Sequence, residues 1–132
     1  MAKPGRTKRV SAAQVRQYLA KAEEWLAAAE DSHKAKRFMA ATGNAVHAGI
    51  NAADAVCGSR MGIRSAAQDH DEVLALVREA GRDGTELAKH LARLLPLKTR
   101  AEYDPDDVSA SAASTAVRHA AQAVAIARRV VG

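Results

Sequence analysis

Apolar residues recur along this chain at helical spacing, interrupted by short polar or glycine-containing breaks. The first apolar stripe consists of Val15, Leu19, Ala22, Leu26 and Ala29. Steps of four and three place these side chains on one face of a helix. Ser11 and Gln14 fit a capping box, in which a hydroxyl and an amide satisfy free backbone N–H groups at a helix start. The pattern therefore predicts a helix over about 11–31.

Four further helices follow from the same argument. A stripe of Met39, Val46, Ile50 and Ala53 predicts a helix over about 36–57, ending in the segment "GSRMG". Acidic residues near Gln68 or Asp69 favour the start of a third helix, which "AGRDG" interrupts. Thr85 is expected to cap a fourth helix that passes through Pro96 with a kink. A last helix is expected from Pro105 or Asp106, with an inner stripe of Val108, Ala112, Ala116, Ala120, Val124, Ala127 and Val131.

Composition supports an all-α fold. Alanine, the best helix former, occupies 32 positions, and aromatic residues make up only 3% of the chain. Short connections favour antiparallel neighbours, so we expect an up-and-down bundle of four to five antiparallel helices. Residues 1–10 are expected to form a flexible basic N-terminal arm, and residues 11–132 the helical bundle.

The positive charge lies mainly in that arm. The formal net charge is +5, and Lys3, Arg6, Lys8 and Arg9 contribute four of these charges. Such an arm adds nonspecific affinity for nucleic acid, although a short basic terminus also serves simply as a solubilising tail. The single Cys57 excludes an internal disulfide and is interpreted as a small buried hydrophobe. No apolar run is long enough to cross a membrane and no export signal is evident, so we expect a cytoplasmic protein.

Antiparallel packing predicts where the cations meet. Alternating helix directions would bring the N-terminal arm, the 58–66 loop and the 97–106 loop to one end of the bundle. The expected ligand-binding residues at that end are Arg60, Arg64, Lys98, Arg100 and Tyr103. Guanidinium groups bind phosphate in a bidentate manner, which makes such an end a site for anions.

Three smaller constellations offer chemistry, each with a structural alternative. His47, Asn51 and Asp54 share a helical face and predict a pocket wall or a subunit interface, unless they bond to neighbouring helices. They are too few for a metal site.

Arg64 and His70 could hold a phosphate and move a proton, although His70 also suits a helix start. Arg100 and Tyr103 could face one anion, unless Tyr103 packs beneath the last helix. Arg64, His70, Arg100 and Tyr103 are thus the candidate catalytic residues. No phosphate loop, metal motif or cofactor motif is present, so no cofactor is expected.

The segments "HAGINAADAV", "DHDEVLALV" and "LARLLPLKTRAEYDP" together resemble the HEPN (higher eukaryotes and prokaryotes nucleotide-binding) superfamily, over roughly residues 12–130. The resemblance is to its small single-domain bacterial members. It implies a helical bundle that forms a homodimer, binds a nucleotide or RNA, and pairs with a nucleotidyltransferase antitoxin in toxin–antitoxin or defence systems. Many members are metal-independent endoribonucleases with an Arg-x4–6-His motif.

This chain departs from the motif that the resemblance implies. Arg100 stands in the matching stretch without a following histidine, and Tyr103 is the nearest polar side chain. The pair Arg64 and His70 has the spacing but lies one loop earlier. The favoured hypothesis is therefore a noncatalytic binding module for a nucleotide, RNA or a partner protein. The alternatives are a HEPN-type ribonuclease toxin and a helical dimer scaffold without a ligand.

Overall fold

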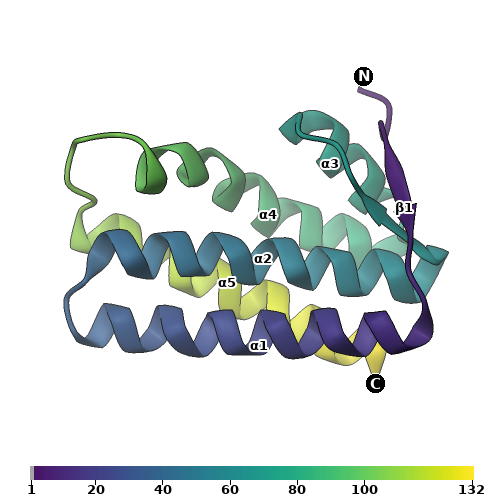
Figure 1. Cartoon of the computed structure of the whole chain (residues 1–132), viewed down its shortest axis with the longest axis horizontal. Coiled ribbons are helices and arrows are strands. Elements are labelled where there is room, and N and C mark those ends of the chain that lie inside the picture. Colours follow the sequence, from purple (N-terminus) through teal and green to yellow (C-terminus); the bar gives the residue numbers. More distant parts are fainter. Residues whose placement is uncertain (1) are drawn as a thin grey trace.

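A computed structural model describes residues 2–132, which form five helices and two short strands. In chain order the elements are β1 (Thr7–Arg9), α1 (Ala12–Lys34), α2 (Phe38–Met61), β2 (Ile63–Ser65), α3 (His70–Arg78), α4 (Gly81–Glu102) and α5 (Ala110–Val131). The helices form one bundle in which α1 and α2 run antiparallel, α4 returns along α2, and α5 crosses behind them at a slant (Figure 1). The prediction of an all-α antiparallel bundle is confirmed.

The first helix begins as its sequence predicts. The Ser11 hydroxyl accepts from the backbone N–H of Gln14 at 3.1 Å, and the Gln14 side chain accepts from the Ser11 N–H at 2.9 Å. This capping box satisfies two N–H groups that the helix itself leaves free. The predicted stripe is buried at Val15, Ala22, Leu26 and Ala29, and Leu19 is half-buried.

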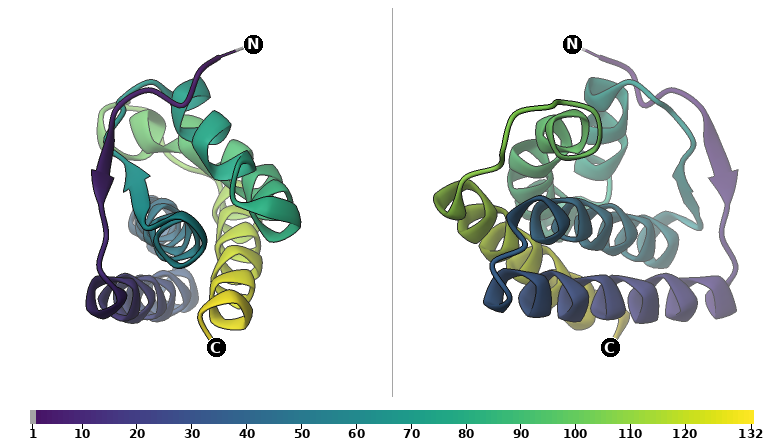
Figure 2. Two further views of the ribbon diagram at one scale, coloured as in Figure 1. Left: turned by 90° about the vertical axis from the view of Figure 1, so that its right-hand side faces the viewer. Right: turned by 60° about the vertical axis from the view of Figure 1, so that its left-hand side comes forward.

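The second helix is the centre of the molecule. It contacts α1, α4 and α5, and it also touches α3 and β2 (Figure 2). Its buried positions are almost all small: Ala41, Thr42, Ala45, Val46, Ala48, Gly49, Ala52, Ala53, Ala55, Val56, Cys57 and Gly58. Small side chains let neighbouring backbones approach closely, so several helices can pack around one axis. The helix ends at Gly62, whose φ of 68° suits glycine.

The N-terminal arm differs from the sequence expectation. We expected residues 1–10 to be flexible, but residues 7–9 form β1 and pair antiparallel with β2, with Lys8 opposite Arg64. Val10 donates its N–H to the Gly62 carbonyl at 2.9 Å, and its side chain is buried against α2 and α1 beside Gly58. A three-residue strand has too little pattern to be recognised in the sequence. Met1 lies outside the described residues.

Several predicted boundaries were wrong. Thr85 lies inside α4, where its hydroxyl donates to the Gly81 carbonyl, so it is no cap. Helix α5 begins at Ala110, because the Ser109 hydroxyl accepts from the N–H of Ala112 at 3.0 Å. Pro105 and Val108 therefore precede the helix. Pro96 lies within α4, but the helix continues to Glu102, through residues that we expected in the 97–106 loop.

One further sequence expectation failed at the start of α2. Met39 was placed on the apolar face, but its side chain is 58% exposed.

Among residues 2–132, no helix is both long and apolar enough to cross a membrane.

The packing of α2 against α4 yields a stability prediction. A Cβ added at Gly49 would lie 2.5 Å from Cδ1 of the buried Leu94, whereas one at Gly43 meets nothing closer than the Ala101 Cβ at 4.0 Å. We expect Gly49→Ala to destabilise the fold by about 1–2 kcal/mol, because overpacking exceeds the gain in helix propensity. Gly43→Ala, on the same helix, should stabilise it by up to about 1 kcal/mol. Urea unfolding measures both, and equal stabilisation by the two changes would contradict the close α2–α4 contact.

Candidate functional site

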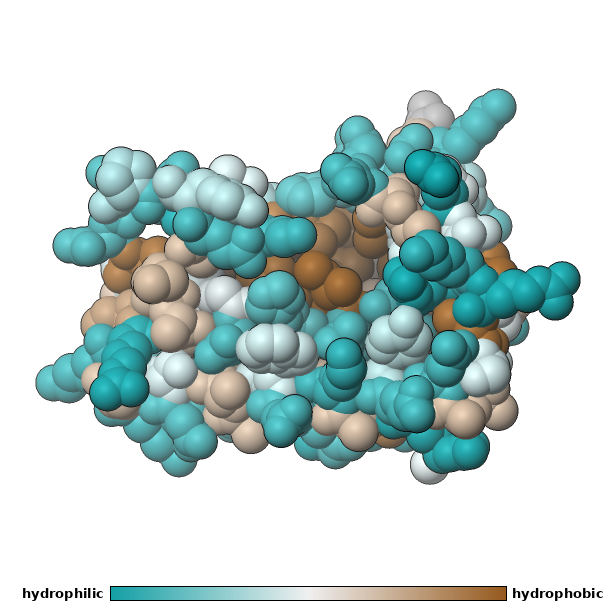
Figure 3. Space-filling view, in the orientation of Figure 1, coloured by the Kyte–Doolittle hydropathy of each residue, from teal (hydrophilic) through white to brown (hydrophobic). Residues whose placement is uncertain are grey.

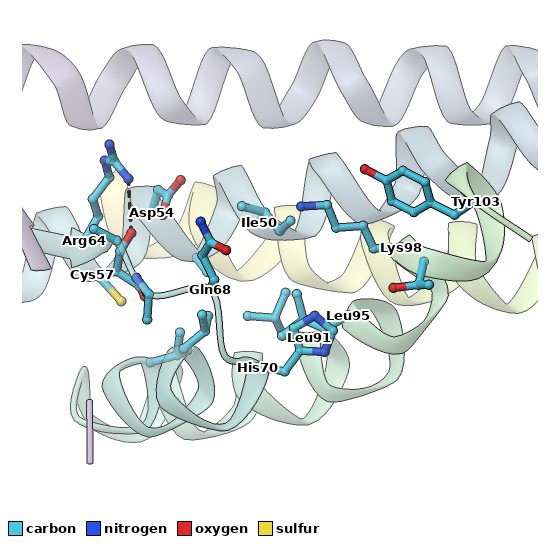
Figure 4. Close-up of a pocket in the computed structure, with 17 residues that line it drawn as sticks. Ile50, Asp54, Cys57, Arg64, Gln68, His70, Leu91, Leu95, Lys98 and Tyr103 are labelled. Carbon is cyan, nitrogen blue, oxygen red and sulfur yellow. Dashed lines mark hydrogen bonds between the residues drawn. The ribbon is translucent and has the colours of Figure 1, made fainter. Parts of the chain in front are cut away.

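A groove of about 570 Å³ lies between α2, α4 and the segment that runs from β2 into α3 (Figure 4). Apolar side chains from three helices form its floor: Ile50, Ala53, Val73, Val77, Leu91 and Leu95. In the space-filling view this hollow is a brown apolar area between α2 and α4, bordered by hydrophilic side chains (Figure 3). A concave apolar floor with a few polar groups around it is the usual form of a small-molecule site.

The polar groups lie at different places along the groove. Figure 4 shows Asp54, Cys57 and Arg64 near one end and Lys98 with Tyr103 toward the other. Gln68 and His70, together with Ser65, Ala66, Ala67 and Thr99, complete the lining. Each end of the groove thus has at least one cation, with the apolar floor between them.

Of the six residues predicted to bind a ligand or to act in catalysis, four line this groove and two do not. Arg64, His70, Lys98 and Tyr103 belong to its lining, whereas Arg60 and Arg100 do not.

Arg60 is engaged in an ion pair. Its Nη2 lies 2.8 Å from the Asp83 carboxylate, which also binds Arg129 at 2.8 Å. Hydrogen bonds from Arg129, and then from Arg60, lower the pKa of Asp83. Since Arg60 already neutralises an acid on α4, it belongs to a surface ion pair between helices rather than to the groove.

The predicted convergence of all cations at one end of the bundle was wrong. The 58–66 loop lies at the end of the bundle where α4 begins, and the 97–106 segment lies at the opposite end (Figure 1). The prediction counted residues 68–80 as a full crossing, but α3 has only nine residues. Chain direction therefore reverses once less than assumed, and Arg100 lies far from β2.

Tyr103 does not occupy the buried position that the sequence offered as its alternative role. Its side chain is 75% exposed, so it does not pack beneath the last helix. Arg100 is exposed as well, near the C-terminal end of α4. The tyrosine ring therefore stands at the open mouth of the groove, where a ligand could contact it.

Arg64 is held on β2 by two contacts. Its Nη1 donates to the Ser65 carbonyl at 3.0 Å, and its guanidinium lies 5.8 Å from the centroid of the Tyr18 ring on α1. A cation over an aromatic face is attracted by the ring's electron-rich surface. Lys8 lies directly opposite Arg64 in the strand pair. This end of the groove therefore has a fixed positive charge.

Asp54 is a carboxyl group in the groove wall that is shielded from water. Burial raises its pKa to about 6, while the charge of Arg64 and a hydrogen bond from Asn51 partly counteract that rise. The Asn51 Nδ2 lies 3.4 Å from one carboxylate oxygen, which is a long contact. A perturbed acid in a cleft is a typical mark of a functional site. The sequence placed Asp54 on a pocket wall or at an interface, and the structure places it on the pocket wall.

His47 and Asn51 lie outside the groove lining. The His47 ring stacks on Trp25 with centroids 4.8 Å apart, and its Nε2 lies 3.5 Å from the Glu102 carboxylate. Asn51 bonds to Asp54 within the same helix. The alternative that these polar residues bond to neighbouring groups therefore holds for His47, which links α1, α2 and α4.

Cys57 lies in the groove lining but is 1% exposed. Burial, followed by the nearby charges of Asp54 and Glu79, raises the pKa of its thiol to about 12. The group therefore stays a neutral thiol at physiological pH and is a poor nucleophile. The interpretation of Cys57 as a small buried hydrophobe is confirmed.

Sequence reasoning missed a histidine pair on the opposite side of α4. Nδ1 of His90 and Nδ1 of His119 lie 3.0 Å apart, joining α4 to α5. Burial, the charge of His90 and two neighbouring arginines lower the pKa of His119. Only the packing of the two helices brings these rings together, since 29 positions separate them. Among residues 2–132, no group of three or more His, Cys, Asp or Glu side chains is arranged to hold a metal ion.

Two other hollows offer less chemistry. One lies between α1, the end of α2 and the C-terminus, and the other lies beneath the β1–α1 connection. Each has a single arginine in its lining, Arg16 and Arg9 respectively, and neither lining contains an acid or a histidine. The groove between α2 and α4 is therefore the candidate functional site.

The half-buried carboxyl group of Asp54 gives a pH-dependent prediction. A folded-state pKa raised to about 6 means that the folded protein binds this proton more tightly than the unfolded chain. The associated stability is present below pH 4 and is lost as the pH rises through 6. We expect Asp54→Asn to stabilise the protein by about 1–3 kcal/mol at pH 7.5 and by less at pH 5.

Urea unfolding at the two pH values measures this difference. The matched control is Asp31→Asn, an exposed acid on α1 whose replacement should change stability by less than about 0.5 kcal/mol. A destabilised Asp54→Asn protein at pH 7.5 would show that the carboxylate makes an essential structural contact.

Comparison with known proteins does not assign the chain to a family. No protein-family model matches the chain, and no curated protein sequence matches it significantly.

Proposed function

We propose that this protein is a noncatalytic HEPN-like binding module whose groove holds a nucleotide. The observation that carries the proposal is the distribution of charge around an apolar floor. Arg64 lies at one end of the groove and Lys98 toward the other, with Ile50, Leu91 and Leu95 between them (Figure 4). A nucleotide combines a planar apolar surface with an anionic phosphate, and both parts find a complementary surface here.

Lys98 is the side chain best suited to the phosphate. It is half-buried on the side of α4 that faces the groove, and Thr99 beside it adds a hydroxyl group. Neither Lys98 nor Thr99 forms a side-chain hydrogen bond or ion pair within residues 2–132. An ammonium group without a bound acid keeps its full attraction for an incoming anion.

The HEPN resemblance extends the proposal beyond the groove. It implies a homodimer, a nucleotidyltransferase antitoxin as partner, and a place in a toxin–antitoxin or defence system. RNA presents the same bases and phosphates in a longer chain, so an RNA segment is also a possible ligand of the groove. The exposed Lys8 and Arg9 on β1 lie beside Arg64, so a chain leaving the groove at that end would meet further cations.

A titration with nucleoside monophosphates tests the proposal. We expect Lys98→Ala to weaken binding at low salt about tenfold or more, because a charge-assisted hydrogen bond to phosphate is lost. Arg100→Ala is the matched control, since it removes a cation two residues away on the same helix but outside the groove. Lys98→Arg should retain most of the affinity. An equal loss in the Lys98 and Arg100 variants would refute the groove as the site.

The second candidate is a metal-independent ribonuclease, and one observation favours testing it. Arg64 and His70 both line the groove. Against it, Figure 4 shows His70 beside Leu91 and Leu95, in another part of the groove from Arg64. Cleavage also needs a group that moves a proton at the 2′-hydroxyl.

Incubation with RNA distinguishes the two candidates. We expect folded protein to leave total RNA intact in the presence of a chelator. Cleavage that disappears in His70→Ala, while the Lys98→Arg protein still cleaves, would establish the ribonuclease instead.

A further inference from the structure

Asp54 has unused hydrogen-bonding capacity inside the groove. A carboxylate offers two oxygens and about four lone-pair sites. Only the long 3.4 Å contact from Asn51 uses one of them, and no ion pair within residues 2–132 involves Asp54. No buried side-chain oxygen or nitrogen in this part of the chain lacks a partner, so the remaining sites of Asp54 are open to the groove. The groove wall thus presents an acceptor to a ligand.

The chemistry of that acceptor selects among nucleobases. The two oxygens of a carboxylate can accept two parallel N–H bonds, and such bidentate pairs are stronger and more specific than single bonds. Guanine presents two adjacent donors on one edge, the N1–H and the 2-amino group. Adenine, cytosine and uracil each lack such a pair of adjacent donors from two neighbouring atoms. A carboxylate in the wall of this groove therefore favours guanine.

Arg64 supplies the complementary charge next to this acceptor. Figure 4 shows Asp54 between Arg64 and Ile50 along the groove. Guanine has its O6 acceptor directly beside N1–H, so a donor adjacent to the carboxylate matches the third position of the same edge. The apolar floor at Ile50, Leu91 and Leu95 then suits the face of the base, and Lys98 lies beyond it for the phosphate.

We propose that the groove selects guanine nucleotides, with the Asp54 carboxylate accepting from N1–H and the 2-amino group of the base. This inference rests on the proposed function of the groove as a nucleotide site. It also gives a role to an acid at a position where burial disfavours its charge. A ligand with two donors stabilises the ionised form and offsets that cost in the complex.

Calorimetric titration of GMP, IMP, AMP and UMP at pH 7.5 and low salt tests the inference. IMP is the matched ligand, because it keeps O6 and N1–H and lacks only the 2-amino group. We expect GMP to bind wild-type protein at least tenfold more tightly than IMP or the other two. In Asp54→Asn the ratio of GMP to IMP affinity should fall to within about twofold, because an amide offers one acceptor oxygen instead of two.

The Lys98→Ala protein is the control for specificity. It should bind all four nucleotides more weakly and keep the preference for GMP. Equal affinities of wild-type protein for the four nucleotides would overturn the guanine inference and leave the groove as a general nucleotide site. An unchanged GMP preference in Asp54→Asn would overturn the role of Asp54. If none of the four binds below millimolar concentration, the proposed function itself is wrong.

Discussion

The close packing of other helices around α2 is the constraint on which the structure depends. Its buried positions are occupied by alanine, glycine and other small residues, so α1, α4 and α5 all pack directly against it. The contact at Gly49 leaves no room for even one added carbon beside Leu94. Interiors of native density gain their stability from many such short contacts, and here these contacts replace large aromatic side chains, which make up only 3% of the chain.

The groove follows from where this packing stops. Helix α3 has nine residues and covers only part of α2 and α4, and the β1–β2 pair fastens the preceding segment to the same end of the bundle. Ile50, Leu91 and Leu95 consequently line the groove, and Asp54 lines it from α2. Burial among the neighbouring residues also raises the pKa of the Asp54 carboxyl group. The packing around α2 therefore determines both the position of the groove and the environment of its carboxyl group.

The sequence predicted the parts of this structure that local rules determine. The stripe of α1 and its Ser11 cap are visible because one face is apolar and the capping side chains lie three residues apart. Helix α2 is buried on most sides, so its sequence pattern does not separate a buried face from an exposed one. Met39 was therefore wrongly assigned to the buried face. The N-terminal arm forms a strand because Lys8 pairs with Arg64, which lies 56 positions later in the chain. Local sequence rules do not predict such a distant partner. The direction of α4 was predicted wrongly, because the short α3 was counted as a helix that runs the full length of the bundle. This error placed Arg100 at the wrong end of the groove.

The central claim, that the space between α2 and α4 is a ligand site, is tested most directly by NMR of methyl-labelled protein during titration with GMP. The account predicts that the methyl groups of Ile50, Leu91 and Leu95 shift most, together with the backbone amides of 64–70 and 98–99. Methyl groups on the far side of the bundle, such as Val124 on α5, should stay unchanged. Shifts that gather around Arg100 and the α4–α5 connection, with Ile50 and Leu91 unmoved, would contradict it.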